Sequence, residues 1–323
     1  MNFGFFGFPS KDNPRILDIR EFDTSGIYTV PNGARAIYAF AIAGGGGGGG
    51  GGRRAVGTNS FGGGPGSGGA QFIGFLPEEV VAIPGVSIQI TIGAGSAGGT
   101  AATADNTTGG SANNGGDTSL AYKGLGGIYG QGEWHPFLYL VGGGGGAGGS
   151  NVGGNAGSVR TSLILGSLTT NLAGLSGNTN ATVNYVVEGP AYNAGSPGCG
   201  VNGTNNLPGV GGNILVAAEN SLYPVALFPY NENPGLNPGT TVFAGGGTNG
   251  GVAGQSADRH IFTNFSSGFG GAGGGGGATA AASNGGNGYR GGGGGGGGGA
   301  RNTFAAGAGG RGGNGYVILA ALR

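Results

Sequence analysis

Residues 24–52 read TSGIYTVPNGARAIYAFAIAGGGGGGGGG, and this stretch decides the fold. The apolar arm at 27–30 is typical of a short strand, and Pro-Asn-Gly at 31–33 is a turn signal. Residues 34–43 alternate small with larger apolar side chains. This alternation predicts a second strand that forms a hairpin with the first arm or adjoins it. Nine consecutive glycines at 44–52 follow directly, so apolar strands are predicted to lead into glycine runs.

Glycine dominates the whole chain, with 90 of 323 residues. The glycines do not recur strictly at every third position and there are only 14 prolines, which excludes collagen. A single cysteine, Cys199, excludes a disulfide scaffold. No run approaches about 18 apolar residues, so no membrane insertion is expected, and residues 1–10 lack the pattern of a secretory signal. A net charge of zero, with two lysines, argues against a nucleic-acid partner.

So much glycine is typical of disorder, but hydrophobic residues reach 37% and aromatic residues 9%, clustered in strand-like segments. Ordered glycine runs bury no side chains, so their N–H and C=O groups must pair between closely packed chains. An α-helix is a poor host for consecutive glycines. Extended polyproline-II-like helices remain, in which a nine-residue run spans about 28 Å. We therefore predict an all-β protein of short antiparallel strands plus a bundle of polyglycine II helices, with long irregular loops at its ends.

The N-terminal segment, residues 1–23, differs from the rest of the chain. It combines the most charged stretch with four phenylalanines, Phe3, Phe5, Phe6 and Phe8. It is either a strand or arm that packs on its own domain, or an anchor whose aromatic row inserts into another subunit. Residues 24–323 are predicted to form one glycine-rich domain of strands and glycine runs. Within it, the glycine-poor segment 158–243 is a candidate inserted loop subdomain.

A second pair of strands is predicted at 70–75 and 86–92, where the second strand alternates cleanly between apolar and polar residues. Further strand candidates lie at 159–165, 182–187, 214–218 and 314–322. Helix signals are nearly absent. Glycine runs alternate with irregular loops without a fixed repeat period, so the loops are expected at the two ends of a rod.

The order of these features resembles the glycine-rich domain of bacteriophage tail-fibre and virion proteins. The resemblance covers about residues 22–147 and 270–322. It is carried by SGIYTVP at 25–31 with the strand and glycine run that follow, GGAQF at 68–72, IPGV at 83–86, GGDTS at 115–119 and GGNGYVIL at 312–319. The long glycine runs are also similar to those of the distal tail-fibre adhesins of T-even-like phages. That likeness implies stacked polyglycine II helices with tip loops that bind a host receptor, although residues 1–23 are too short for the attachment domain of such adhesins.

No motif predicts catalysis. Matches to Gly-x-Gly-x-x-Gly arise by chance in this composition and lack a surrounding βαβ unit. Glu133, Trp134 and His135 contain an acid–base pair, but such a triplet in an aromatic loop more often serves packing or lies on the surface. His135 and His260 are the only histidines, too few for metal-ligand spacing. We expect a protein that is not an enzyme and that needs no cofactor and no metal.

Receptor-binding candidates are aromatic, histidine and arginine side chains of the predicted loops. Trp, Tyr and Arg are enriched at binding hot spots, and Arg suits phosphate contacts. The candidates are Arg53, Arg54, Tyr129, Trp134, His135, Phe137, Tyr192, Tyr223 and Tyr230. Their loops, and others of the same kind, are 53–61, 128–140, 185–208, 219–243, 255–269 and 278–290. Alternatively, the aromatic residues cap a core that has no side chains at its edges, and the arginines only keep the surface soluble.

These features predict a virion fibre-tip adhesin that binds a host surface polysaccharide or an outer-membrane protein through loops on a rigid bundle. Its N-terminus is expected to contact other virion subunits. The alternative is a structural virion component, namely a head fibre, decoration or tail protein anchored by the same segment. A more remote alternative is an ice-binding polyglycine protein. The sequence leaves open whether the chain forms a homo-oligomer.

Overall fold

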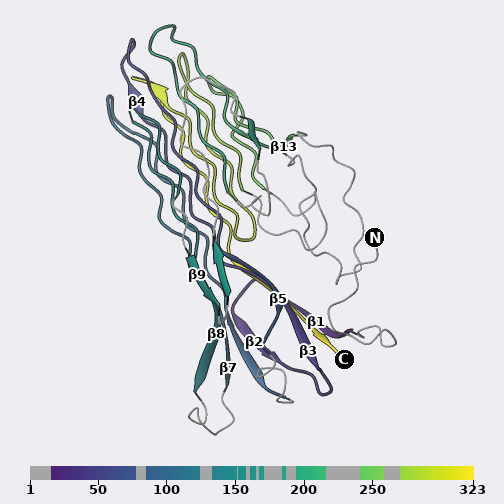
Figure 1. The fold of residues 1–323 in the computed structure, drawn as a ribbon. Helices are drawn as coiled ribbons and strands as arrows, with labels where there is room; N and C mark the ends of the chain where they lie inside the picture. The colour runs from purple at the N-terminus through teal and green to yellow at the C-terminus, as the bar shows by residue number, and fades with distance from the viewer. Residues whose placement is uncertain are drawn as a thin grey trace.

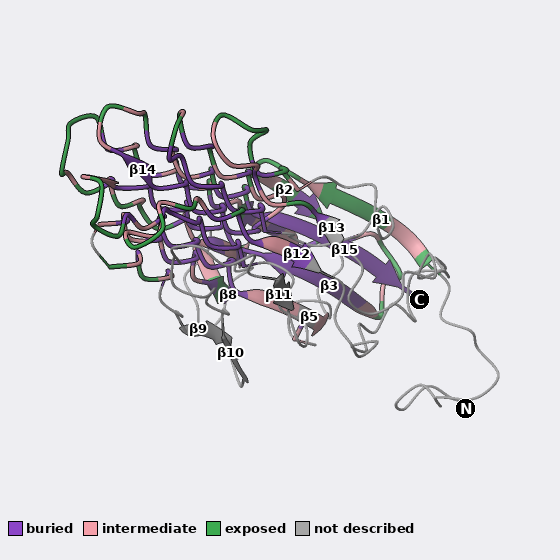
Figure 2. Ribbon diagram, turned by 90° about the horizontal axis from the view of Figure 1, so that it is seen from above, coloured by how far each residue is buried: buried purple, intermediate pink, exposed green. Residues whose placement is uncertain are grey.

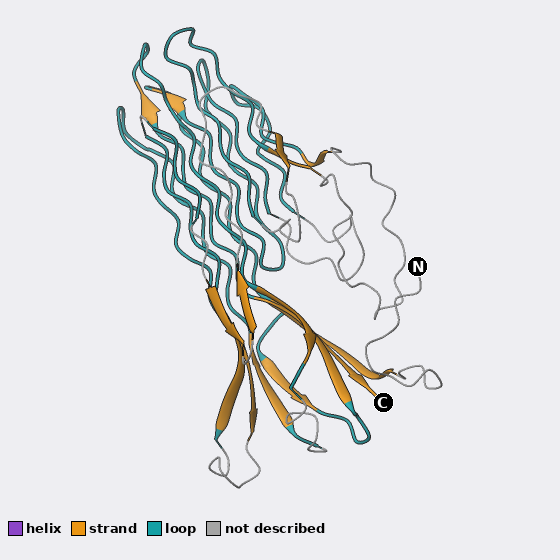
Figure 3. Ribbon diagram, viewed as in Figure 1, coloured by secondary structure: helices purple, strands orange, loops and turns teal. Residues whose placement is uncertain are grey.

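The computed structural model describes residues 16–77, 85–123, 133–150, 152–157, 161–164, 167–170, 184–186, 194–215, 241–257 and 270–323. Within these ranges the chain forms strands and extended segments and no helix. Two antiparallel sheets lie at one end, and glycine-rich segments run side by side from them to a tip at the other end (Figures 1 and 3). The prediction of an all-β fold with antiparallel sheets is confirmed.

Most strands are short and belong to the sheet end. In chain order they are β1 (Ile16–Phe22), β2 (Gly26–Thr29), β3 (Ala36–Ile42), β4 (Arg53–Arg54), β5 (Gln71–Phe75), β6 (Ser87–Thr91), β7 (Thr118–Lys123), β8 (Trp134–Leu140), β9 (Thr161–Ile164), β10 (Ser167–Thr170), β11 (Asn184–Val186), β12 (Asn213–Leu215), β13 (Thr241–Phe243), β14 (Ala300–Arg301) and β15 (Tyr316–Leu322). The predicted strands at 34–43 and 314–322 correspond to β3 and β15.

The four-stranded sheet has the order β1-β15-β3-β5 and is antiparallel throughout. β3 and β15 pair along their whole length, from Ala36 opposite Leu322 to Ile42 opposite Tyr316. Side chains alternate between the two faces of a strand, so Ile37 faces one way and Tyr38 the other. Both faces of β3 and β15 are buried. The apolar runs that the sequence places here therefore serve two packed surfaces.

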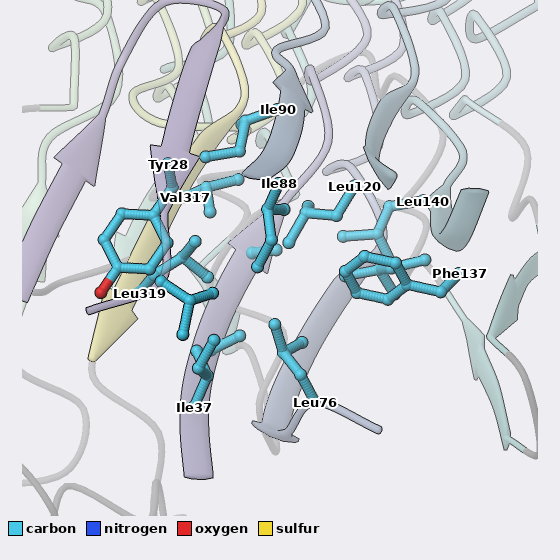
Figure 4. Close-up of a cluster of buried hydrophobic side chains, with 14 of the residues drawn as sticks. Tyr28, Ile37, Leu76, Ile88, Ile90, Leu120, Phe137, Leu140, Val317 and Leu319 are labelled. Carbon is cyan, nitrogen blue, oxygen red and sulfur yellow. The ribbon is translucent and has the colours of Figure 1, made fainter. Parts of the chain in front are cut away.

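The six-stranded sheet has the order β10-β9-β8-β7-β6-β2 and is also antiparallel. Its inner face packs against one face of β3 and β15. Ile88, Leu120 and Leu140 are fully buried there and belong to one hydrophobic cluster with Val317 and Leu319 (Figure 4). Each large aliphatic side chain buried in this way contributes about 1.5–3 kcal/mol to stability, so this contact forms the side-chain core of the molecule.

The hairpin alternative for 27–43 is wrong, and the predicted pair of strands at 70–75 and 86–92 does not form. β2 pairs with β6, whereas β3 lies between β15 and β5, so the turn at 31–33 carries the chain between sheets instead of closing a hairpin. Gly33 in this turn has a φ of 84°, which favours glycine. β5 and β6 likewise belong to different sheets. β15 and β5 occupy the two edges of β3, so neither edge is free for a local hairpin.

The N-terminal strand β1 is part of the four-stranded sheet. It pairs with β15 from Ile16 opposite Leu322 to Phe22 opposite Val317. Within the predicted segment 1–23, residues 16–22 thus pack on their own domain. Phe3, Phe5, Phe6 and Phe8 lie outside the described residues.

The glycine-rich segments are joined by backbone hydrogen bonds that repeat every three residues. Along 44–52, successive N–H groups donate in turn to three segments, 110–116, 307–313 and 61–67. Successive carbonyls of the same run accept in turn from three others, 96–102, 143–149 and 294–300. The run 292–299 also has neighbours on all sides. Both central runs lie in the buried interior seen in Figure 2.

This packing excludes side chains from the central runs. A Cβ atom added at any position of 44–52 would lie 1.9–2.5 Å from a neighbouring carbonyl oxygen. Ordinary carbon–oxygen contacts are about 3.3 Å or longer. Glycine is therefore required throughout the run, because the neighbouring backbones occupy the space that a side chain needs.

Burial in the outer segments also repeats every three residues, although no repeat period is evident from the sequence. In 93–102, the residues at 93, 96 and 99 are buried, whereas Ala94, Ala97 and Thr100 are exposed. Polar side chains accept hydrogen bonds from glycine N–H groups at the bundle surface. Along one row, Gly142, Gly145 and Gly148 donate to Asp117, Asn114 and Ser111 at 2.8, 3.0 and 3.3 Å. These side chains satisfy donors that would otherwise face solvent, as protected sheet edges do.

Parts of the predicted inserted segment 158–243 belong to the six-stranded sheet and to the glycine bundle. β9 and β10 extend the six-stranded sheet, and residues 194–200 run within the glycine bundle. Ser196 and Cys199 are fully buried there.

Candidate functional site

The tip of the bundle is a cluster of loops. The glycine-rich segments reverse there at 53–60, 103–108, 201–208, 247–252, 278–282 and 300–306, and also near Val152. The short parallel pair β4–β14 marks this end (Figure 1). Exposed residues gather on these loops above the buried bundle (Figure 2). Of the loops predicted to bind a receptor, 53–61 lies at the tip, together with residues 201–208 of the predicted loop 185–208 and residues 278–282 of the predicted loop 278–290.

Arg53 and Arg54 form β4 at this tip, as the sequence analysis expected of a loop after a glycine run. The Arg53 side chain is only 11% exposed and donates to the Asp105 carboxylate at 2.5 Å and to the Thr103 carbonyl at 2.7 Å. Its charge is therefore neutralised within the loops. Arg54 is half-buried and donates to the Arg53 carbonyl at 2.8 Å. Arg53 thus acts mainly in joining loops 53–60 and 103–108.

Tight turns hold the tip loops. Among the described residues, five other than glycine have a positive φ, and four of them lie at the tip, namely Asn106, Asn206, Asn249 and Thr303. Asn tolerates this conformation better than most side chains. Asn106 and Asn302 are joined twice, by an N–H of Asn106 to the Asn302 side chain at 3.0 Å and by their amides at 3.2 Å. The tip loops therefore have a defined conformation set by side-chain amides.

Exposed aliphatic side chains lie on four tip loops. Val56, Val152, Leu207 and Val252 are 76%, 64%, 57% and 84% exposed. Single exposed aliphatic residues are ordinary on protein surfaces, but these four share one end of the molecule. The sequence analysis did not select them, because isolated aliphatic residues among Gly, Asn and Thr form no pattern.

Trp134, His135 and Phe137 lie on β8, at the sheet end and far from Arg53 and Arg54 (Figure 1). Phe137 is 4% exposed and packs in the core beside Tyr122, with ring centroids 6.1 Å apart. As a receptor contact Phe137 is therefore ruled out by its burial, and it fits the alternative role of packing. Trp134 and His135 are half-buried, and the His135 ring lies 5.8 Å from that of Tyr122. The structure does not bring these residues together with the tip loops.

Four receptor-binding candidates remain. Tyr129, Tyr192, Tyr223 and Tyr230 lie outside the described residues, as does most of the predicted loop 219–243.

The sheet end carries a second feature, an open groove of about 430 Å³ between the edge strands β1 and β2. It is lined by Asp18, Arg20, Glu21, Phe22, Ile27, Tyr28 and Thr29. Burial is the main cause that raises the pKa of the Tyr28 hydroxyl to about 12, and the nearby Asp18 carboxylate raises it further. This groove lies beside β1, where the chain enters the described structure.

A cluster joins β1 to the glycine bundle. The Arg290 guanidinium lies 3.7 Å from the ring centroid of Tyr316 and 3.7 Å from the Glu21 carboxylate. The Tyr316 hydroxyl donates to the same carboxylate, and burial is the largest cause of its raised pKa. This arrangement fixes the end of β1 against a turn of the bundle.

The described ranges hold no group of three or more His, Cys, Asp or Glu side chains placed to bind a metal ion. A search of the same ranges for a helix long and apolar enough to cross a bilayer finds none. Comparisons of the chain with protein-family models and with curated protein sequences give no match.

Proposed function

We propose that this chain is a bacteriophage virion protein that sits at a fibre tip and binds a host surface receptor through its tip loops. One observation carries the proposal. Loops that are far apart in the sequence gather at one end of a hydrogen-bonded bundle, whereas Ile16 and the C-terminal Arg323 lie at the opposite end (Figure 1). A loop cluster at the opposite end of the bundle from β1 and β15 is an arrangement suited to presenting a binding surface.

The glycine segments in this proposal are polyglycine II helices. The three-residue period of their hydrogen bonds and the neighbours on every side of 44–52 support it, because such helices have three residues per turn and no internal hydrogen bonds. The close approach of carbonyl oxygens to every glycine of that run supports it as well. A bundle of this kind would hold the loops rigidly, which limits the entropy lost when a receptor binds.

The sheet end would face the virion in this arrangement. The chain enters it at β1, so the segment with Phe3, Phe5, Phe6 and Phe8 is the proposed anchor to other virion subunits. The open groove beside β1 supports a contact at this end. The same observation favours the second candidate, a structural virion component anchored by this end.

The exposed aliphatic side chains favour a protein receptor over a polysaccharide. Val56, Val152, Leu207 and Val252 offer apolar contact area at the tip, and burial of apolar area is the main favourable term in most protein–protein association. The charge of Arg53 is already neutralised by Asp105, which weakens a purely phosphate-based contact. Binding of this kind needs no cofactor and no catalytic group.

The experiment is adsorption of the purified protein to susceptible cells. A variant with serine at 56, 152, 207 and 252 should lose most adsorption, whereas Thr100→Ala on the side of the bundle should keep it. Cells treated with protease should lose binding, and cells treated with periodate should retain it. If the wild-type protein does not adsorb, or the serine variant adsorbs normally, the adhesin proposal is wrong. Thermal hysteresis of the purified protein would instead support the ice-binding alternative.

A further inference from the structure

Arg301 lies beneath the tip and is the largest fully buried polar side chain among the described residues, at 1% exposure. Its guanidinium donates four hydrogen bonds to two loops. Nε donates to the Asn206 side chain and Nη2 to the Asn202 carbonyl, both at 2.6 Å. Nη1 donates to the Ala55 carbonyl at 3.0 Å and also to the Thr58 carbonyl. One side chain thus connects loop 53–60 with loop 201–208.

The acceptors of Arg301 are all neutral, and three of the four are backbone carbonyls. A buried charge is costly unless hydrogen bonds replace its hydration, and hydrogen bonds to a charged donor are stronger than neutral ones. The conformation of both loops is therefore favoured by the same group. Because backbone carbonyls do not depend on side-chain identity, Val56 and Leu207 can change without loss of these three bonds.

We propose that Arg301 is a positioning residue that holds loops 53–60 and 201–208 in their receptor-binding conformation while leaving their exposed side chains free to vary. This inference rests on the proposed receptor-binding function of the tip. It assigns the rigidity of the loops to a buried residue and the specificity to exposed residues such as Val56 and Leu207.

The effect of Arg301 should be confined to the outer parts of the loops. Their bases are joined independently, because Ser60 and Val201 exchange backbone hydrogen bonds of 3.0 and 2.8 Å. The Asn59 side chain also accepts from the Gly203 N–H at 2.7 Å. Loss of Arg301 is therefore expected to loosen residues 55–58 and 204–206, whereas the bonds of Ser60 with Val201 and of Asn59 with Gly203 keep the loops joined at their bases.

The experiment compares the full chain with Arg301→Met and Arg301→Lys, and with Arg311→Gln as a control for charge loss on the exposed side of the bundle. Amide hydrogen exchange is measured on peptides covering 54–59, 202–207 and 292–299, and adsorption to susceptible cells is measured in parallel. In Arg301→Met, exchange in the two loop peptides should rise about tenfold or more, with 292–299 unchanged. Adsorption should fall. Arg301→Lys should lie between this variant and the wild type, because one ammonium group reaches fewer carbonyls.

Unchanged exchange in both loop peptides would overturn the proposal, and so would faster exchange with undiminished adsorption. If exchange at 292–299 also becomes faster in Arg301→Met, the test uses Arg301→Lys instead. Unchanged exchange in both loop peptides of Arg301→Lys, or faster exchange with undiminished adsorption, would then overturn the proposal. Failure of the wild-type protein to adsorb would refute the receptor-binding function instead, and the exchange data would still show whether Arg301 holds the loops.

Discussion

Replacing Gly48 by alanine tests the close packing of the glycine bundle. Gly48 lies midway along 44–52, where its N–H donates to the Gly310 carbonyl at 2.9 Å and its carbonyl accepts from Gly99 at 2.7 Å. An alanine Cβ would lie 2.1 Å from the carbonyl oxygen of Gly295 and 2.5 Å from its carbonyl carbon. Both contacts are with backbone, so no side-chain rotation relieves them.

The magnitude follows from the contacts that must move. Overpacking costs about 1–3 kcal/mol, and each of the two hydrogen bonds that the displacement distorts contributes about 0.5–1.5 kcal/mol. Alanine regains only about 0.4–1 kcal/mol by restricting the unfolded chain. Gly48→Ala is therefore expected to lower the free energy of unfolding by about 1–6 kcal/mol.

Urea denaturation of the wild type and the variant measures this change. Gly74→Ala in β5 is the matched control, because its Cβ would meet only the end of the Phe72 ring, at 3.3 Å. We expect the control to change the free energy of unfolding by less than about 1 kcal/mol. Equal free energies for Gly48→Ala and the wild type would refute the argument that neighbouring backbones fill the space beside Gly48.

Three further predictions concern buried groups. Ser196→Ala removes an acceptor of the Gly273 N–H at 2.8 Å and a donor to the Gly212 carbonyl at 2.7 Å, so it should lower the free energy of unfolding by about 2–4 kcal/mol. The control Ser256→Ala, on the surface, should lower it by less than about 1 kcal/mol. Equal effects of the two variants would contradict the burial of the Ser196 hydroxyl. Burial raises the pKa of the Cys199 thiol from 9.0 to about 12, so the unfolded chain loses this proton at a lower pH than the folded chain, and the free energy of unfolding should fall as pH rises above about 9. Denaturation at pH 8 and pH 10 should show a smaller fall for Cys199→Ala than for the wild type. An identical fall would disprove the raised pKa of Cys199. Phe137→Ala should lower the free energy of unfolding by about 3–5 kcal/mol because it empties a core position. Trp134 is half-buried, so Trp134→Ala should lower this free energy by less. A larger loss for Trp134→Ala than for Phe137→Ala would place Phe137 outside the core.

The sequence predicted the individual strands better than their pairing. The apolar alternation of 34–43 and 314–322 is local information, and both strands form. Their pairing with each other joins residues from the two ends of the chain, which no turn signal encodes. The hairpin expected from Pro31 to Gly33 failed for that reason.

The three-residue period was hidden by glycine itself. In the central runs every position is glycine, so no pattern of side chains exists there. Side chains follow the three-residue period only in outer segments such as 93–102, where every third residue is exposed and is Ala94, Ala97 or Thr100. A search for small or polar residues spaced by three would have found it.

The candidate site was predicted in part. Arg53 and Arg54 follow a glycine run and lie at the tip, whereas Trp134 precedes one and lies at the sheet end. Residues that precede a glycine run starting in a sheet lie at the sheet end, as β8 does before the run that starts at Gly142. The role of Arg301 has no local signal in the sequence, because its acceptors Ala55 and Asn206 are 246 and 95 residues away.

Amide hydrogen exchange resolved along the glycine segments tests the central claim most directly, that the glycine backbone is itself an ordered core. All nine amides of 44–52 should be protected to nearly the free energy of global unfolding, because each N–H is hydrogen-bonded and buried. In the outer segment 93–102, protection should repeat every three residues, with Ser96, Gly99 and Ala102 slow and Ala94, Ala97 and Thr100 fast. Exchange of 44–52 at the rate of an unstructured chain would contradict the account.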